Sequence, residues 1–160
     1  MRAKNPRKAA FDTYENCVKG DPGWRGRWQE RTSGKPITLE LGCGRGDFSL
    51  GLARMQPERF VIGMDLKRDR LWSCGRQALE EKLDNVMFVC EHAEKLPELF
   101  ADGELDSLWL TFPDPFPKYR HSPRRMSGPR YLSLYQRLLA PGRPFQFKTD
   151  NAELFRWTLE

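Results

Sequence analysis

The chain has 160 residues, of which 39% are hydrophobic and 31% are charged, and this is enough material for one ordinary globular core. Its 13 Gly and 12 Pro exceed average usage only modestly, which argues against a collagen-like or low-complexity chain. No apolar run approaches the length of about 20 residues that a membrane-spanning helix needs, and the amino-terminal residues lack the apolar core of a signal peptide. We therefore expect a cytoplasmic protein with no membrane association.

The charge balance is basic, because 27 Lys and Arg against 22 Asp and Glu give a formal net charge of +5. A basic chain favours a polyanionic partner, and a solvated basic surface is the alternative. The four cysteines lie far apart and form no C-x-x-C pair, which indicates neither a zinc site nor a disulfide framework. We expect no metal site and buried free thiols at Cys17, Cys43, Cys74 and Cys90.

Residues 1–35 are basic, rich in Arg and Trp, and interrupted by turn residues, so we expect an arm or a short helix that precedes the domain. From residue 36 onward, two kinds of apolar pattern alternate. Short apolar runs with the length of buried strands occur at Ile37–Leu41, Phe60–Met64, Val86–Cys90, Leu105–Phe112 and Phe145–Phe147. Stretches with apolar residues at helical spacing occur at Phe48–Met55, Arg68–Lys82, Glu94–Phe100 and Tyr131–Leu139.

This alternation of strands and helices predicts an α/β domain over residues 36–160, with a mainly parallel sheet and helices on both faces. In such sheets the ligand binds at the carboxyl ends of the strands. Functional residues should therefore follow each predicted strand directly.

Glycines alternate with side chains after the first predicted strand, in the run Glu40-Leu41-Gly42-Cys43-Gly44-Arg45-Gly46-Asp47. Glycine lets the backbone approach a ligand closely and adopt positive φ, so a nucleotide-like cofactor is the first hypothesis. A dinucleotide fingerprint would need glycine where Asp47 stands, and its pyrophosphate would lie beside that carboxylate. Carboxylates around Gly42 and Gly44 instead suit S-adenosylmethionine, which carries an ammonium and a sulfonium but no phosphate. A purely structural turn is the alternative.

The ends of the next two predicted strands carry Asp65 and His92. Asp65 lies roughly 20 residues after the glycine loop, the separation at which an acidic residue binds ribose hydroxyls in this class of sheet. Its alternative role is to cap the helix that begins near Arg68. His92 occupies the usual position for an adenine contact, and an ordinary surface histidine is the equal alternative.

The segment after the fourth predicted strand is the most informative part of the chain. Prolines fix φ and remove backbone donors on both sides of Asp114, which predicts a rigid loop at the place where substrate must lie. Basic residues follow, with aromatic rings between them, at Lys118, Tyr119, Arg120, His121, Arg124, Arg125 and Arg130. Cations that neutralise phosphates beside rings that stack on bases indicate RNA, and a solvated basic loop is the alternative. Asp150 follows the last predicted strand and would place a carboxylate at the same edge of the sheet. Its alternative role is to cap the helix expected over 151–159.

These motifs together resemble the bacterial tRNA (guanine-N7-)-methyltransferases, which use S-adenosylmethionine to methylate a guanine in the tRNA variable loop. The resemblance covers about residues 36–160. It rests on the run from Glu40 to Gly46, on Phe112-Pro113-Asp114-Pro115 with Lys118, on Arg124-Arg125, and on Lys148-Thr149-Asp150, in this order. It implies a Rossmann-like class I S-adenosylmethionine methyltransferase fold.

The resemblance also implies roles for single residues. Glu40, Asp65 and His92 would bind the cofactor together with Gly42 and Gly44, although many family members have an acidic residue where His92 stands. Asp114 would bind the cofactor and act at the methyl-transfer centre. Lys118 and Asp150 would bind the substrate, and the basic residues Arg120, Arg124 and Arg125 would contact tRNA.

Family members continue for tens of residues beyond the position of Glu160, so we expect this sheet to lack its closing carboxyl-terminal strands. A non-catalytic or partner-activated RNA-binding module with the same fold is therefore the alternative to an enzyme. Both a monomer and a homodimer are consistent with the sequence. The chemistry itself needs no nucleophile or metal, because guanine N7 already carries an in-plane lone pair.

Overall fold

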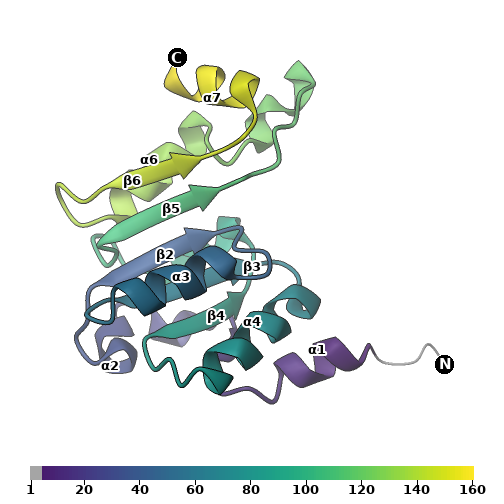
Figure 1. The fold of residues 1–160 in the computed structure, drawn as a ribbon. Helices are drawn as coiled ribbons and strands as arrows, with labels where there is room; N and C mark the ends of the chain where they lie inside the picture. Colours follow the sequence, from purple (N-terminus) through teal and green to yellow (C-terminus); the bar gives the residue numbers. More distant parts are fainter. Residues whose placement is uncertain (1–4) are drawn as a thin grey trace.

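Six parallel strands form the centre of the computed structural model, which describes residues 5–160 (Figure 1). The strand order is β1-β4-β3-β2-β5-β6. The strands are β1 (Cys17–Lys19), β2 (Ile37–Leu41), β3 (Phe60–Asp65), β4 (Val86–Cys90), β5 (Ser107–Thr111) and β6 (Phe145–Lys148). The five strands expected from the apolar runs are thus confirmed, and the parallel sheet is as the alternation predicts.

Helices cover both faces of the sheet (Figure 1). One face packs against α1 (Pro6–Phe11), α3 (Asp47–Met55) and α4 (Arg68–Glu80), and the other against α2 (Trp28–Thr32), α5 (Leu96–Leu99) and α6 (Pro129–Leu138). A last helix, α7 (Ala152–Leu159), follows β6, and short 3-10 turns are η1 (Pro22–Trp24), η2 (Ala93–Lys95) and η3 (Tyr119–Arg124). The apolar core therefore has two layers, one on each side of the strands.

Residues 5–35 do not form an arm ahead of the domain but are part of it; residues 1–4 of the expected arm lie outside the described residues. Strand β1 pairs with β4 as an added edge strand. Trp28 is fully buried, its indole Nε1 donates to the Leu99 carbonyl over 2.8 Å, and its ring stacks on Phe100. The basic composition of this segment concealed these contacts, because only a few of its side chains are buried.

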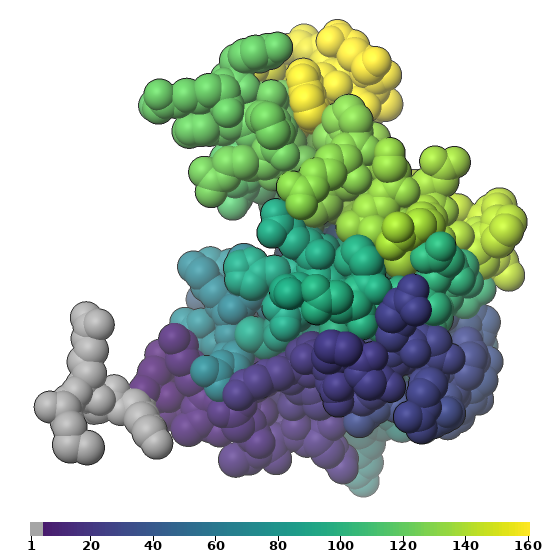
Figure 2. Space-filling view, turned by 180° about the vertical axis from the view of Figure 1, so that it is seen from behind, coloured from purple at the N-terminus to yellow at the C-terminus, as the bar shows by residue number. Residues whose placement is uncertain are grey.

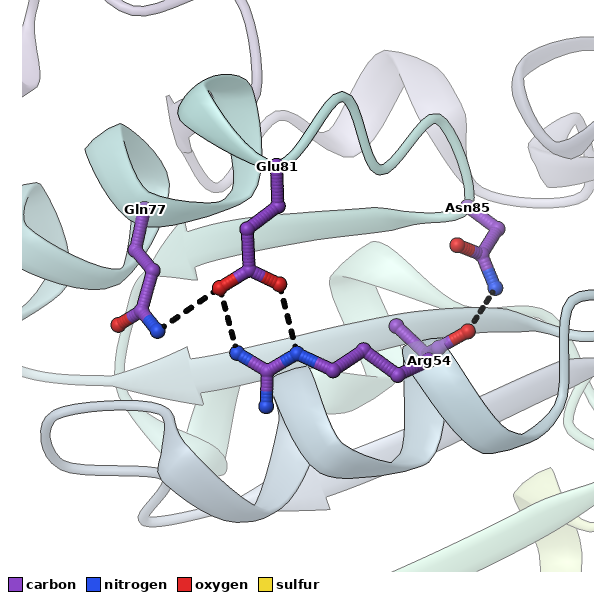
Figure 3. Close-up of polar contacts among 5 residues, drawn as sticks. Arg54, Gln77, Glu81 and Asn85 are labelled. Atoms are coloured by element: carbon purple, nitrogen blue, oxygen red, sulfur yellow. Dashed lines mark hydrogen bonds and ion pairs between the residues drawn. The ribbon is translucent and has the colours of Figure 1, made fainter.

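A polar cluster joins α3 to the end of α4 (Figure 3). Arg54 donates two hydrogen bonds to Glu81, over 2.6 and 2.7 Å, and Gln77 donates a third to the same carboxylate. The bonds from Arg54 lower the pKa of Glu81 to about 2. Beside them, the Asn85 amide donates to the Ala53 carbonyl. These contacts hold together the two helices that follow the glycine loop and the Asp65 turn.

All four cysteines are free, and three of them are buried as expected, whereas Cys90 is half-buried. Burial raises the pKa of Cys17 to about 12, so this thiol is protonated and unreactive at neutral pH. Within residues 5–160, no helix has both the length and the apolar character to cross a bilayer. In the same residues, His, Cys, Asp and Glu side chains form no group of three or more that could hold a metal ion.

Candidate functional site

The strand order changes direction between β2 and β5, which are neighbours in the sheet, so this is the topological switch point. Strands β3 and β4 extend the sheet to one side of β2, and β5 and β6 extend it to the other. Loops diverge at such a point and leave a crevice at the carboxyl ends of the strands. A cavity of about 370 Å³ lies there, and its lining includes Gly42, Asp65, Glu91, Phe112, Asp114 and Met126.

The glycine loop adopts a backbone that other residues rarely accept. Gly42, Gly44 and Gly46 have φ values of 71°, 57° and 76°, which explains why glycine recurs at every second position. A Cβ on Gly46 would lie 2.6 Å from the Cβ of Cys74, so this glycine also permits the close approach of α4. Gly44 has no atom within 4 Å of an added Cβ, so its backbone faces open space.

Asp65 fixes the glycine loop to the end of β3. One of its carboxylate oxygens accepts from the Gly44 N–H over 3.0 Å, and the other accepts from the Lys67 N–H over 3.0 Å. The second bond belongs to the turn before α4, whose N-cap residue is Lys67 and which has no side-chain cap, so Asp65 does not cap this helix. Its predicted contact with ribose hydroxyls stays a prediction. The side chain also lines the cavity, where its remaining lone pairs can accept from hydroxyl groups.

Glu40 lies inside the sheet rather than on the cavity lining. It is 1% exposed, and its carboxylate accepts from the Ser49 hydroxyl over 2.5 Å and from the Thr111 hydroxyl over 2.6 Å. Burial raises the pKa of Glu40, whereas the bonds from the two hydroxyls lower it. Glu40 thus joins β2, α3 and β5 at the point where the sheet changes direction, and its predicted contact with a cofactor stays a prediction.

Replacing Ser49 with alanine is expected to lower the free energy of unfolding by about 1 to 3 kcal/mol near neutral pH, because the buried Glu40 carboxylate loses a donor. Burial raises the pKa of Glu40, so its stabilising contribution is complete below the ordinary carboxyl pKa and is lost as pH rises through the raised value. The alanine substitution should raise this pKa further, so the loss in free energy of unfolding relative to the wild type should grow with pH. Urea unfolding at about pH 4.5, near the ordinary carboxyl pKa, and at about pH 7.5, well above it, measures the change.

The matched control is Ser127→Ala, which removes a buried hydroxyl that bonds to Thr158 and not to a carboxylate. Its deficit should be the same at both pH values. An equal deficit for Ser49→Ala at both values would contradict the role assigned to the charge on Glu40.

At the end of β4, Glu91 and not His92 lines the cavity. The Glu91 carboxylate accepts from the His92 N–H over 2.8 Å, and the His92 side chain is exposed. Sequence reasoning missed Glu91, although the alternation of side chains along β4 and its extension could have pointed to it. The adenine contact predicted for His92 is not tested by this geometry and stays a prediction.

The proline-rich loop after β5 holds Asp114 between two strained residues. Phe112 and Phe116 have φ values of 46° and 42°, in the left-handed region that bulky side chains avoid. Such backbone persists only where the surrounding contacts impose it, and it occurs most often at functional sites. Phe112 is 55% exposed beside the cavity, and its N–H donates to the Lys148 carbonyl over 2.8 Å.

Arg125 is the main contact that imposes the conformation of this loop. Its side chain is buried, and it donates from Nε to the Pro115 carbonyl over 2.9 Å and from Nη2 to the Phe116 carbonyl over 3.1 Å. The guanidinium also lies over the ring of Trp157 in α7, with 4.4 Å between Cζ and the ring centroid. Sequence reasoning placed Arg125 among the tRNA contacts, whereas the structure directs these donors into the protein.

The other predicted substrate residues are exposed and are not among the residues that line the cavity: Lys118, Arg120, Arg124 and Asp150. Arg124 lies over the Phe116 ring, with 4.9 Å between its Cζ and the ring centroid. Asn151, not Asp150, caps α7, since its side chain accepts from the Leu154 N–H over 2.7 Å. The cap role considered for Asp150 therefore belongs to its neighbour, and the Asp150 carboxylate remains exposed.

Comparison with known proteins agrees with this geometry. A family model described as "Putative methyltransferase" matches residues 34–160. The tRNA (guanine-N(7)-)-methyltransferase of Lactococcus lactis subsp. cremoris is 38% identical over 163 aligned positions, which cover 99% of this chain and 75% of the relative. This chain belongs to the tRNA (guanine-N7-)-methyltransferase family. In Cytophaga hutchinsonii, the protein of the same name is 41% identical over 86% of this chain, but the match spans only 62% of the relative.

Solved structures confirm the fold of this family member. The crystal structure of the aminoglycoside resistance methyltransferase NpmB1 superimposes with a TM-score of 0.60 and is 31% identical, covering 77% of this chain and 60% of that protein. The Rossmann-like class I fold expected from the resemblance is therefore confirmed. Membership of the methyltransferase family also supports S-adenosylmethionine as the cofactor.

Proposed function

We propose that this chain transfers a methyl group from S-adenosylmethionine to N7 of a guanine in the tRNA variable loop. The observation that carries the proposal is the position of Asp114, which a strained loop directs to the lining of the cavity beside Asp65. Exposed cations on the same loop give an RNA strand a surface next to this opening. The names of the relatives supply the tRNA and the guanine N7.

The residues around the cavity fit the chemistry of the cofactor. Asp65, Glu91 and Asp114 provide carboxylates that attract an ammonium and a sulfonium and accept from ribose hydroxyls. Gly42 lines the cavity without a side chain, and the space beside Gly44 is open, so a ligand can approach the backbone of this loop closely. S-adenosylmethionine, when bound, supplies a methyl group that is already activated for transfer.

The protein itself has to position the guanine and stabilise the charge that develops on it. Guanine N7 needs no strong base, because its lone pair is free in the plane of the ring. Holding N7 in line with the methyl group is a proximity effect that contributes several kcal/mol, about 7 or more in well-oriented systems. The purine becomes cationic as the bond forms, and the fixed carboxylate of Asp114 stabilises that charge.

The decisive test is transfer of labelled methyl from S-adenosylmethionine to an unmodified tRNA transcript, followed by nucleoside analysis. We expect 7-methylguanosine in the wild-type transcript and none in a transcript whose variable-loop guanines are replaced by adenine. Calorimetry with S-adenosylhomocysteine should show binding, whereas NAD should give no heat. Tight tRNA binding without any 7-methylguanosine would instead favour the non-catalytic RNA-binding module.

A further inference from the structure

A second basic surface lies on the other side of the cavity from the proline-rich loop. A hollow of about 320 Å³ is lined by Arg7 of α1, Arg45 of the glycine loop, and Arg70 and Trp72 of α4. We call these four residues the arginine pocket. They come from segments far apart in the sequence, so no local motif revealed them.

Within residues 5–160, the arginine pocket carries more positive charge than the carboxylates on its lining balance. The ion pairs of the described residues involve none of Arg7, Arg45 and Arg70. Asp69 is the one carboxylate on the lining among the described residues, against three guanidinium groups. The three arginine side chains are exposed, and Arg7 and Arg76 approach the Trp72 ring to 6.0 and 5.0 Å from its centroid.

The arginine pocket lies next to the cavity. Arg70 lines both the pocket and the cavity that Asp65 and Asp114 share. In Figure 1, the strand arrows point toward the right, where the green segment that contains η3 lies in the upper part of the view and α1 in the lower part. Figure 2 shows a hollow in the surface between the green segment above and the teal and purple segments below.

We propose that the arginine pocket binds the phosphate backbone of the substrate RNA, on the opposite side of the cavity from the basic loop. The inference rests on the proposed function, because it takes the RNA to be one that presents a base to the cavity. A strand whose base enters the cavity continues away from it in both directions. Phosphates on one side then meet Lys118, Arg120 and Arg124, and those on the other side meet the arginine pocket, where Trp72 offers a ring for stacking.

The test compares two double variants that remove the same charge. Arg7→Gln with Arg45→Gln alters the pocket. The control, Arg137→Gln with Arg143→Gln, alters exposed arginines that form surface ion pairs with Asp102 and Asp106, away from the cavity. Binding to an unmodified tRNA transcript is measured from low to high salt. Each lost phosphate contact lowers the slope of log K against log salt by about 0.7 to 0.9, so the pocket variant should lose about 1.4 to 1.8 and the control almost nothing.

Four outcomes would overturn the inference. An unchanged slope in the pocket variant would show that these arginines contact no phosphate. An equal loss in the control would show that they act only through net charge. An equal loss of affinity for S-adenosylhomocysteine would show that Arg45 supports the cofactor loop instead. Weaker binding of inorganic phosphate with unchanged tRNA binding would indicate a site for a small anion.

The outcomes also separate this inference from the proposed function. If the wild type binds tRNA with the expected salt slope but forms no 7-methylguanosine, the proposed function fails and the arginine pocket stands. If it methylates tRNA and the pocket variant keeps the wild-type slope, the proposed function stands and the inference about the arginine pocket fails. If the wild type binds no tRNA at all, both are overturned.

Discussion

Replacing Asp114 with alanine is expected to lower turnover by about 100-fold or more, with little change in tRNA affinity. The carboxylate lines the cavity from a loop in which both flanking phenylalanines have positive φ, so its position is set before the substrate arrives. In the proposed reaction its charge matters most when the purine becomes cationic, so its removal should affect the transition state more than the bound substrate. Single-turnover assays at saturating tRNA, with separate binding measurements, give both quantities.

Arg124→Ala is the matched contrast on the same loop, because Arg124 is exposed and lies over the Phe116 ring. It should weaken tRNA binding and reduce the salt slope by about 0.7 to 0.9, while turnover at saturating tRNA stays near the wild-type value. If both variants lose turnover equally with unchanged affinity, the loop acts as one unit and the division of roles is wrong.

Arg125→Lys should also lower turnover strongly, by about 100-fold if the loop shifts by about 1 Å. Lysine keeps the charge but cannot donate to the carbonyls of Pro115 and Phe116 from one planar group, as the guanidinium does. The loop that carries Asp114 would then lose its main contact. The measurement is the turnover number together with the tRNA dissociation constant and its salt dependence.

This substitution distinguishes a positioning role from a phosphate contact. A phosphate contact would survive in Arg125→Lys, because lysine also neutralises phosphate, and turnover would stay near the wild-type value. Arg124→Lys is the control and should leave turnover nearly unchanged. Trp157→Leu, which removes the ring beneath the guanidinium, should lower turnover in the same direction by a smaller factor. Normal turnover in Arg125→Lys would refute the positioning role.

Much of the fold could be predicted from local patterns in the sequence. The runs at Ile37–Leu41 and Val86–Cys90 became strands with those same bounds, since a continuous apolar run of this length has few other ways to be buried. Both glycine positions chosen for the site, Gly42 and Gly44, have positive φ. The location of the cavity followed from topology, because a parallel sheet with crossovers places its strand ends together.

The parts that sequence reasoning missed depend on contacts between distant residues. Nothing near Arg125 in the sequence indicates that Trp157 covers its guanidinium, so it resembled its exposed neighbours. Likewise, Glu40 stands at the expected strand end, but the donors that occupy it come from Ser49 and Thr111 on other elements. Charge and residue type alone do not distinguish a side chain that faces solvent from one that is bonded within the protein.

The pairing of β1 with β4 affects the order in which a growing chain can fold. Cys17 lies opposite Phe88, so the edge strand has no partner until more than 70 residues after it have been synthesised. Long-range pairing of this kind slows folding, because the loop must close before the contact stabilises anything. On the ribosome, the segment from α1 to β1 would thus emerge well before its partner strand, and Phe11, which is buried in the folded protein, would be open to chaperones and proteases during that interval.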